Sequence, residues 1–231
     1  MKLAIMQPYF MPYIGYWQLI SSVDTFVIYN NIQYTKKGWF NRNRFLQNGK
    51  DFLFSIPLKK DSDYLNVNER FISPAFDKKK LIVKFRKAYA KAPYLKEVMP
   101  LLEKIINFDE ENLFNCIYNS ILKVCEYLEI DTKIVISSEI KIDHDLKGEK
   151  KVFAICKSLG ATTYINTVGG IELYDKNEFK SEDLELNFIK SKPIEYKQFN
   201  NEFIPWLSIV DVLMFNNKEE VKQMLKRINS V

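Results

Sequence analysis

The chain has 231 residues, 47% of them hydrophobic, and its 34 Lys and Arg against 29 Asp and Glu give a formal net charge of +5. This length suits one large domain, or a core with a smaller subdomain, and the hydrophobic share supplies material for that core. The mild charge permits an anionic ligand without requiring nucleic acid, and no apolar run approaches the ~20 residues of a membrane span, so we expect no membrane insertion.

The first 29 residues predict a strand, a loop, a helix and a second strand. Leu3–Met6 is a continuous apolar run, Ile14–Ser22 has the pattern of a short helix, and Thr25–Tyr29 is rich in β-branched and aromatic residues. A right-handed crossover through this helix makes the two strands parallel.

Strand and helix patterns continue along the chain. Strands are predicted at Phe52–Pro57, Val67–Ile72, Ile134–Ile136, Thr163–Ile165 and Leu184–Ile189. Helices are predicted at Lys78–Ala90, Pro93–Ile106, Glu111–Leu128, Lys150–Leu159, Trp206–Phe215 and Glu219–Ile228. We therefore expect residues 1–231 to form a single α/β domain with a Rossmann-like parallel sheet core and a helical subdomain inserted at about 77–128.

The loop after the first strand holds the first set of candidate site residues. Ligands of open parallel sheets bind beyond the carboxyl ends of the strands, and a loop that enters a helix presents free N–H groups to anions. Tyrosines can stack on a ring-shaped ligand or form hydrogen bonds with it. The alternative is a tight turn with aromatic packing. The candidates here are Gln7, Tyr9, Tyr13, Gly15, Tyr16 and Gln18.

The loop after the second strand mixes basic and aromatic residues. It follows the neighbouring strand, so we expect it to line the same cleft and to bind phosphate. Such a mix suits a nucleotide or a nucleotide sugar as well as single-stranded nucleic acid. The alternative is a solvated basic loop. The candidates are Asn30, Gln33, Lys36, Lys37, Trp39, Asn41, Arg42 and Asn43.

Two further pairs follow predicted strands. Gly169 and Gly170 suggest a close approach of backbone to a ligand, or a bare turn. Ser137 and Ser138 stand at the end of another strand, where they bind substrate or cap the next segment.

His144 and Asp211 are the candidates for acid–base chemistry. His144 is the single histidine, which excludes a multi-histidine metal centre, and we expect no metal. It is either a general base or a surface residue. Asp211 lies in an apolar helix and needs a partner, so it is an anchor for the opening loop or an active-site carboxylate. The three cysteines are odd in number and lack Cys-x-x-Cys spacing, which favours a cytoplasmic protein without disulfides.

Several short motifs occur in order along nearly the whole chain. They are Met6-Gln7-Pro8-Tyr9-Phe10, Pro12-Tyr13-Ile14-Gly15-Tyr16, Gly38-Trp39, Asn41-Arg42-Asn43-Arg44, Gly169-Gly170 and Leu207-Ser208-Ile209. In these motifs the chain resembles the WbqC-like protein family. The resemblance implies a place in bacterial surface-polysaccharide (O-antigen-type) biosynthesis and points to acylation or aminoacylation of an amino sugar.

The segment Tyr13-Ile14-Gly15-Tyr16 at a helix start is also distantly similar to the HxGH signature of the nucleotidyltransferase superfamily. In that superfamily two histidines stabilise the phosphates during adenylyl transfer. Tyr13 and Tyr16 stand at both positions here, so the resemblance implies the fold and a phosphorylated ligand rather than that reaction.

Three functions compete. The first is an acyl- or aminoacyltransferase acting on the amine of a nucleotide-linked amino sugar, with Tyr13 and Tyr16 at the oxyanion and His144 or Asp211 as the base. Its donor is unknown: an acyl thioester on coenzyme A or a carrier protein, or an aminoacyl-tRNA. The second is a nucleotidyltransferase-like or ATP-dependent ligase, and the third is a non-catalytic nucleotide-sugar-binding subunit. A homo-oligomer stays open.

Overall fold

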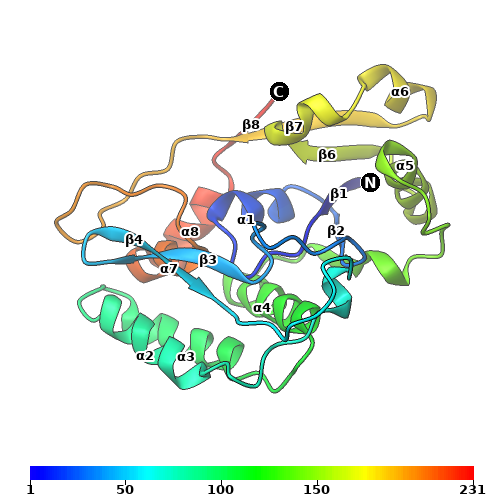
Figure 1. Cartoon of the computed structure of the whole chain (residues 1–231). Coiled ribbons are helices and arrows are strands. Elements are labelled where there is room, and N and C mark those ends of the chain that lie inside the picture. Colours follow the sequence, from blue (N-terminus) through cyan, green and yellow to red (C-terminus); the bar gives the residue numbers. More distant parts are fainter.

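The computed structural model describes all residues from Met1 to Val231 and has a six-stranded sheet at its centre (Figure 1). The strands are β1 (Lys2–Met6), β2 (Thr25–Ile28), β5 (Lys133–Ile136), β6 (Thr163–Thr167), β7 (Glu185–Ser191) and β8 (Ile228–Ser230). Their order is β5-β2-β1-β6-β7-β8, with β8 antiparallel to β7 and the other pairs parallel. The fold is a Rossmann-like α/β fold, as the sequence predicts.

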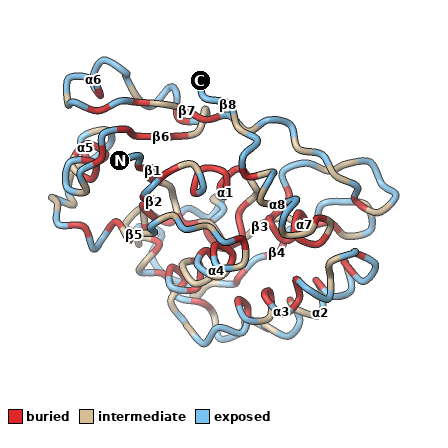
Figure 2. The backbone as a smooth tube through the Cα atoms, turned by 180° about the vertical axis from the view of Figure 1, so that it is seen from behind, coloured by how far each residue is buried: buried red, intermediate tan, exposed pale blue.

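The central strands are apolar on both sides because helices cover both faces of the sheet. Leu3 and Ile5 of β1 pack in a cluster of 14 buried residues with helices α5 (Gly148–Leu159) and α6 (Lys176–Ser181). Ala4, between them, points to the opposite face and a cluster of 46 buried residues. Figure 2 shows these buried stretches running through the strands.

The larger cluster contains residues from all six remaining α-helices. These helices are α1 (Ile14–Ser21), α2 (Lys78–Ala88), α3 (Leu95–Ile106), α4 (Leu113–Leu128), α7 (Ile209–Phe215) and α8 (Lys218–Leu225). Helices α2, α3 and α4 fall within the predicted helical insertion, and they share this cluster with the sheet. In Figure 1 α2 and α3 lie at the lower left and α5 and α6 at the upper right. None of the helices combines the length and apolar composition that crossing a membrane requires.

A hairpin of β3 (Arg42–Gln47) and β4 (Lys50–Ser55) precedes these helices. Its two-residue turn, Asn48-Gly49, has φ values of 52° and 71°. Asn-Gly suits this turn because both positions need positive φ. The predicted strand Val67–Ile72 is wrong: the segment starts as the 3₁₀ helix η1 (Val67–Glu69), and the hairpin supplies the partner of β4.

Two predicted boundaries near the carboxyl end also differ from the structure. Helix α7 begins at Ile209 instead of Trp206, because Ser208 is its N-cap and accepts a hydrogen bond from the Val210 N–H. Helix α8 ends at Leu225, and the chain then turns into β8, which extends the sheet beside β7.

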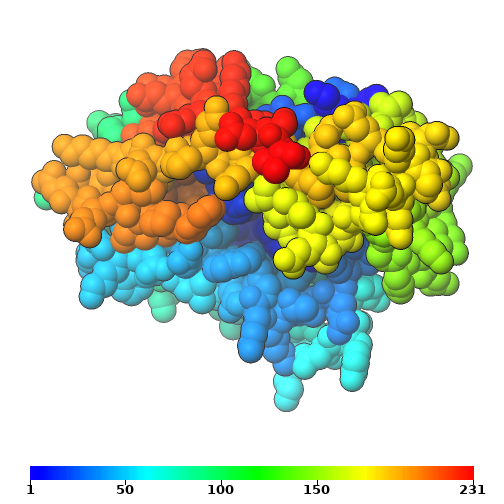
Figure 3. Space-filling model, turned by 90° about the horizontal axis from the view of Figure 1, so that it is seen from above, coloured from blue at the N-terminus to red at the C-terminus, as the bar shows by residue number.

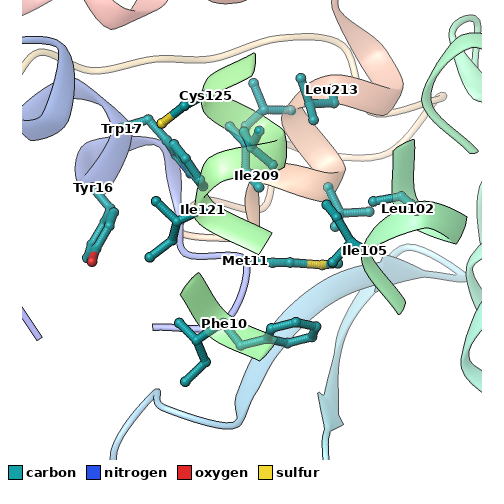
Figure 4. Close-up of a cluster of buried hydrophobic side chains, with 14 of the residues drawn as sticks. Phe10, Met11, Tyr16, Trp17, Leu102, Ile105, Ile121, Cys125, Ile209 and Leu213 are labelled. Atoms are coloured by element: carbon teal, nitrogen blue, oxygen red, sulfur yellow. The ribbon is translucent and has the colours of Figure 1, made fainter. Parts of the chain in front are cut away.

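The loop between β1 and α1 is fixed in the larger cluster by Phe10 and Met11. Both side chains are buried, and Figure 4 shows them pointing among residues of α3, α4 and α7. The Asn43 side-chain amide donates to the carbonyls of Phe10 and Met11, at 3.2 and 2.9 Å. The Ser208 hydroxyl donates to the Met11 carbonyl at 2.7 Å. Met11 has φ 45°, so these contacts hold an uncommon backbone conformation.

Replacing Phe10 by Ala should therefore lower the free energy of unfolding by about 3–5 kcal/mol, because it opens a cavity in the core. Urea denaturation followed by circular dichroism measures the change. The matched control is Phe108→Ala, at an exposed Phe, with an expected change below about 1 kcal/mol. Equal losses in both variants would mean that Phe10 does not anchor the loop.

Candidate functional site

The carboxyl ends of β1, β2 and β6 meet at a cavity of about 510 Å³, which we call the switch-point cavity. The chain passes from β1 to β2 through α1, and it reaches β6 through α5, which packs on the opposite face. The strand order therefore reverses between β1 and β6, and ligands of open parallel sheets bind at such a reversal. The volume lies within the ~300–1,000 Å³ range of small-molecule sites.

Polar and aromatic side chains from four segments line the switch-point cavity. They include Gln7 and Tyr9 after β1, Tyr29 after β2, Glu149 and Lys151 in the first turn of α5, and Asn166, Gly169, Gly170 and Tyr174 in or after β6. The chemistry of the cavity is thus that of a few polar groups in a largely aromatic and aliphatic wall.

Lys151 is a buried cation without a carboxylate partner. Its side chain is only 4% exposed, and its ammonium group donates to the His144 carbonyl at 2.9 Å and lies 5.0 Å from the centre of the Tyr29 ring. It takes part in no ion pair. Burial, reinforced by the charge of Lys147, lowers the pKa of Lys151, and the charges of Asp145 and Asp143 partly oppose this shift. A buried charge in this state favours an anionic ligand that would supply the missing counter-charge.

The amino end of α5 adds to this positive potential. No side chain caps the helix, and its first residues Gly148 and Glu149 line the cavity. Uncapped N–H groups and the helix dipole favour negative charge at this end. Together with Lys151 they form a place suited to phosphate. Glu149 is the one carboxylate among the lining residues, and it accepts a hydrogen bond from the Asp175 N–H at 3.0 Å.

A chain of hydrogen bonds runs from the ends of β2 and β5 to the backbone that holds Lys151. The Ser137 hydroxyl lies 3.0 Å from Asn30 Oδ1 and 2.6 Å from Asn31 Oδ1, and the Asn30 amide donates to the Ser138 hydroxyl at 2.9 Å. Asn31 Nδ2 lies 3.1 Å from His144 Nδ1. The predicted residues Asn30, Ser137, Ser138 and His144 therefore come together, as a scaffold beside the cavity.

His144 itself lines no part of the switch-point cavity. Its Nε2 lies 3.1 Å from the Ile140 carbonyl and its Nδ1 faces Asn31, so both ring nitrogens are engaged. With Nε2 as the donor and Nδ1 as the acceptor, a neutral ring satisfies both contacts. This geometry gives His144 the role of positioning the carbonyl that holds Lys151.

Gly169 and Gly170 lie at the cavity, in the 3₁₀ segment η3 (Val168–Leu173) that follows β6. A Cβ atom added at Gly170 would lie 2.7 Å from Asn166 Nδ2, so any larger residue here would have to displace the Asn166 side chain. The close approach expected from the two glycines is made by the Asn166 side chain.

The opening loop divides its residues between two places. Gln7 and Tyr9 line the switch-point cavity, and the Tyr9 hydroxyl donates to Gln7 Oε1 at 3.0 Å. Tyr16 is buried and donates to the Gln7 carbonyl at 3.0 Å. The Tyr13 ring covers Gly15, where an added Cβ would lie 2.4 Å from it, and reaches a second hollow.

We call this second hollow the aromatic slot. It has a volume of about 270 Å³. The residues that line it are Tyr9, Pro12, Tyr13, Trp39, Asn43, Arg44 and Trp206. Tyr9 lines both hollows, so they adjoin. In Figure 3 the amino-terminal segment, in dark blue, forms the floor of a hollow between the yellow segment after β6 and the orange segment before α7.

The loop after β2 sends none of its basic side chains to the switch-point cavity, contrary to the single cleft expected. Arg42 donates to the carbonyls of Lys37 and Gly38 in its own loop. Lys36 forms an exposed ion pair with Asp63, and Lys37 is exposed.

The amides of this loop are structural. Gln33 donates to the Asp63 carbonyl, and the buried Asn41 accepts from Tyr34 and donates to the Ile56 carbonyl. Trp39 and Asn43 line the aromatic slot.

Gln18 and Asp211 are buried away from both hollows. Gln18 donates to the carbonyls of Met224 and Arg227. The Asp211 carboxylate accepts from Tyr89, Tyr196 and Gln198 at 2.8, 2.7 and 2.7 Å. Burial raises the pKa of Asp211, and the three hydrogen bonds oppose that rise. The geometry is that of a structural anchor. It holds Tyr89 and the segment of Tyr196 and Gln198, and not the opening loop, which was its expected target.

Lys151, Glu149, Tyr29, Asn166, Tyr174 and Trp206 were not predicted as site residues, whereas Arg44 belongs to the basic loop that was expected to line a cleft. Only Lys151 left a clear sequence signal. It precedes Ile155 by four residues and so falls on the apolar face of its helix. A lysine on an apolar helix face is uncommon and indicates a functional or structural role. Cys116, Cys125 and Cys156 are buried, and burial raises their pKa values to about 11, 12 and 12. No three side chains of His, Cys, Asp or Glu come close enough to hold a metal ion.

Comparison with known proteins is consistent with the motifs read from the sequence. The WbqC-like protein family matches residues 7–223, which include all lining residues of both hollows except Ile5 and Met6, and four of the six strands of the sheet. The chain belongs to the WbqC-like protein family. A relative in Mycobacterium tuberculosis, the uncharacterized protein Rv1507c, is 27% identical over 228 residues, which are 97% of each chain. No solved structure matches. The switch-point cavity and the aromatic slot thus describe a candidate site of a WbqC-like protein.

Replacing Asp211 by Ala should destabilise this WbqC-like protein by about 3 kcal/mol or more, because three buried donors lose their acceptor. Thermal and urea unfolding measure the loss. The exposed Asp109→Ala is the control, with an expected change near zero. A stable Asp211→Ala protein that has lost only ligand binding would contradict the anchoring role.

Proposed function

We propose that the switch-point cavity binds a nucleotide-linked amino sugar and that the protein transfers an acyl or aminoacyl group to its amine. The observation that carries the proposal is Lys151, a buried cation without an ion-pair partner at the uncapped end of α5. A diphosphate would give it a counter-ion, and the position at the strand-order reversal supports a nucleotide.

The cavity has groups for each step of the transfer. The amine nitrogen attacks the carbonyl carbon of the donor; the new C–N bond forms, and the C–S bond of a thioester or the C–O bond of an ester breaks. Glu149 is the lining carboxylate that would take the proton from the attacking amine. Burial raises the pKa values of Tyr9 and Tyr174, so both hydroxyls stay protonated. Tyr9 would exchange its hydrogen bond to Gln7 Oε1 for one to the oxyanion, and Tyr174 would supply a second donor.

The donor would be a thioester of coenzyme A or of a carrier protein, or an aminoacyl-tRNA, and the net charge of +5 suits each of these anionic partners. We place the reaction in the cytoplasm, in a surface-polysaccharide pathway of the O-antigen type. The three buried cysteines without disulfides support that location. A homo-oligomer is compatible with the proposal.

A nucleotidyltransferase-like reaction is the second candidate, and the sheet order and the position of the cavity favour it. The tyrosines at its signature positions argue against it. The Tyr16 hydroxyl is buried and donates to the Gln7 carbonyl, and Tyr13 lines the aromatic slot. Release of pyrophosphate from ATP with an acid substrate would decide for this candidate.

A thermal-shift panel tests the proposed substrate class. The ligands are UDP-glucosamine, a dTDP-linked 4-amino-4,6-dideoxyhexose, coenzyme A, ATP and tRNA. We expect stabilisation by a nucleotide amino sugar, since a ligand that binds only the folded state raises its stability. Mass spectrometry of that sugar after incubation with each donor then detects acylation. Stabilisation by ATP alone would contradict the proposal, and tight sugar-nucleotide binding without turnover would indicate a binding subunit.

Lys151→Met keeps the aliphatic stem and removes the charge. We expect the affinity for the stabilising nucleotide sugar to fall roughly 10- to 100-fold, in line with the loss of a charged hydrogen bond. Isothermal titration calorimetry measures it. Lys150→Met is the matched control, because Lys150 is exposed on the same helix turn. If both variants bind like the wild type, the phosphate site lies elsewhere.

Glu149→Gln should leave nucleotide-sugar affinity within about threefold of the wild type and lower kcat for acylation by ~100-fold or more, as expected for loss of a general base. Steady-state kinetics separate kcat from KM. The control is Glu195→Gln, at an exposed glutamate that does not line the cavity. An unchanged kcat in Glu149→Gln would remove this residue from the reaction.

A further inference from the structure

Trp206 has a combination of features that packing does not explain. The residue is 63% exposed, and its φ of 62° lies in the left-handed region that bulky residues rarely adopt. Backbone strain of this kind persists only where neighbouring contacts enforce it, and it gathers at ligand sites.

Arg44 supplies the enforcing contacts. Its Nη2 donates to the Trp206 carbonyl at 3.3 Å, and its own carbonyl accepts from the Ser208 N–H at 2.8 Å. Arg44 also pairs with Asp51 at 2.8 Å, which fixes the guanidinium. The turn that presents the Trp206 ring is therefore tied to β3 at two points.

The rings of the aromatic slot meet at steep angles. Tyr13 and Trp206 have centroids 5.6 Å apart and planes tilted by 65°. The guanidinium of Arg44 lies 5.8 Å from the centre of the Trp39 ring, so it supplies charge at the slot wall. A flat nucleobase cannot lie parallel to both tilted rings. A pyranose is thicker: its C–H face suits the electron-rich face of an aromatic ring, and its hydroxyls suit the donors of Arg44.

The size and position of the slot are consistent with one ring. Its 270 Å³ is about half of the 510 Å³ of the switch-point cavity. Tyr9 forms part of the wall of both hollows. A ligand that extends past Tyr9 would thus place a nucleotide in one hollow and a single ring in the other.

We propose that the aromatic slot binds the sugar ring of the nucleotide-linked substrate and that Trp206 is its stacking platform. The ring carbon that bears the amine then lies at the Tyr9 edge of the slot, with the amine facing Glu149 in the switch-point cavity. This inference rests on the proposed function, because the slot receives the sugar whose diphosphate lies near Lys151. The strained turn holds the Trp206 ring in place before the ligand binds. Binding therefore loses less affinity to the ordering of this side chain.

Four dissociation constants test the inference. Wild type and Trp206→Ala are each titrated with the nucleotide sugar that stabilises the protein most and with the same nucleoside diphosphate without sugar. In the wild type the sugar should improve affinity about 5- to 10-fold, and Trp206→Ala should abolish that advantage, as expected for loss of a ring contact. The nucleoside diphosphate should bind both proteins within twofold.

Three further variants serve as controls for the effects of ring loss, backbone conformation and surface substitution. Trp206→Phe keeps an aromatic face and should keep most of the sugar advantage. Trp206→Gly removes the ring where glycine adopts the backbone freely, so it should bind like Trp206→Ala but melt roughly 2–4 °C higher. Tyr64→Ala, at a tyrosine 86% exposed and outside both hollows, should change neither constant.

The remaining outcomes distinguish failure of the slot as a sugar site from failure of the proposed function. Equal weakening of both ligands by Trp206→Ala, or no change in either, overturns the slot as a sugar site while the proposed function stands. If no nucleotide sugar binds at all, the proposed function fails. Free glucosamine then tests the slot alone: a saturable change of tryptophan fluorescence, lost in Trp206→Ala, supports it, and no change overturns it.

Discussion

The fold depends on how the loop between β1 and α1 divides its side chains. Phe10 and Met11 enter the large hydrophobic cluster, while Gln7 and Tyr9 remain at the switch-point cavity. Burying two such side chains contributes several kcal/mol, since each is worth about 1.5–3 kcal/mol. Buried carbonyls need partners, and Asn43 from the hairpin and Ser208 from the cap of α7 supply them. Packing and hydrogen bonds of this one short loop thus connect the insertion and the carboxyl-terminal helices to the first strand.

The electrostatics of the site follow from the sheet topology. The reversal of strand order brings the amino end of α5 beside the ends of β1 and β2, and Lys151 enters the cavity from that helix. Its ammonium has only a backbone carbonyl as a hydrogen-bond partner, which stabilises a cation less than a carboxylate does. The chain of Asn31 and His144 fixes that carbonyl. Of the basic residues that look most suited to phosphate in the sequence, Lys36 is paired with Asp63, Arg42 is bound within its own loop and Lys37 is exposed.

The parallel core could be predicted because its strands are short runs of consecutive apolar residues. Such runs are typical of strands that are buried on both faces of a sheet. The hairpin is not predicted although Asn48-Gly49 marks its turn, because Arg42–Gln47 is rich in polar residues and its first residues, Arg42–Arg44, are interpreted as the end of the basic loop. Val67–Ile72 has strand composition, but its neighbours in space impose a 3₁₀ turn. The position of Gln7 and Tyr9 at the switch-point cavity could be predicted from the strand order. The features of Lys151 and Trp206 could not, because a buried lysine without an ion-pair partner and a tryptophan with positive φ arise only in the assembled fold.

The floor of both hollows is also a piece of the core, and this limits how such a protein can evolve. Under the proposed function, a substitution in Gln7–Tyr13 that improves contact with a new substrate puts the anchoring of Phe10 and Met11 at risk, so binding and folding are selected together there. The rims carry no such burden: Ile171 and Leu173 in η3 and Trp206 before α7 are exposed. Divergence of substrate preference among descendants of this chain should therefore concentrate in those rims, over a floor that changes little.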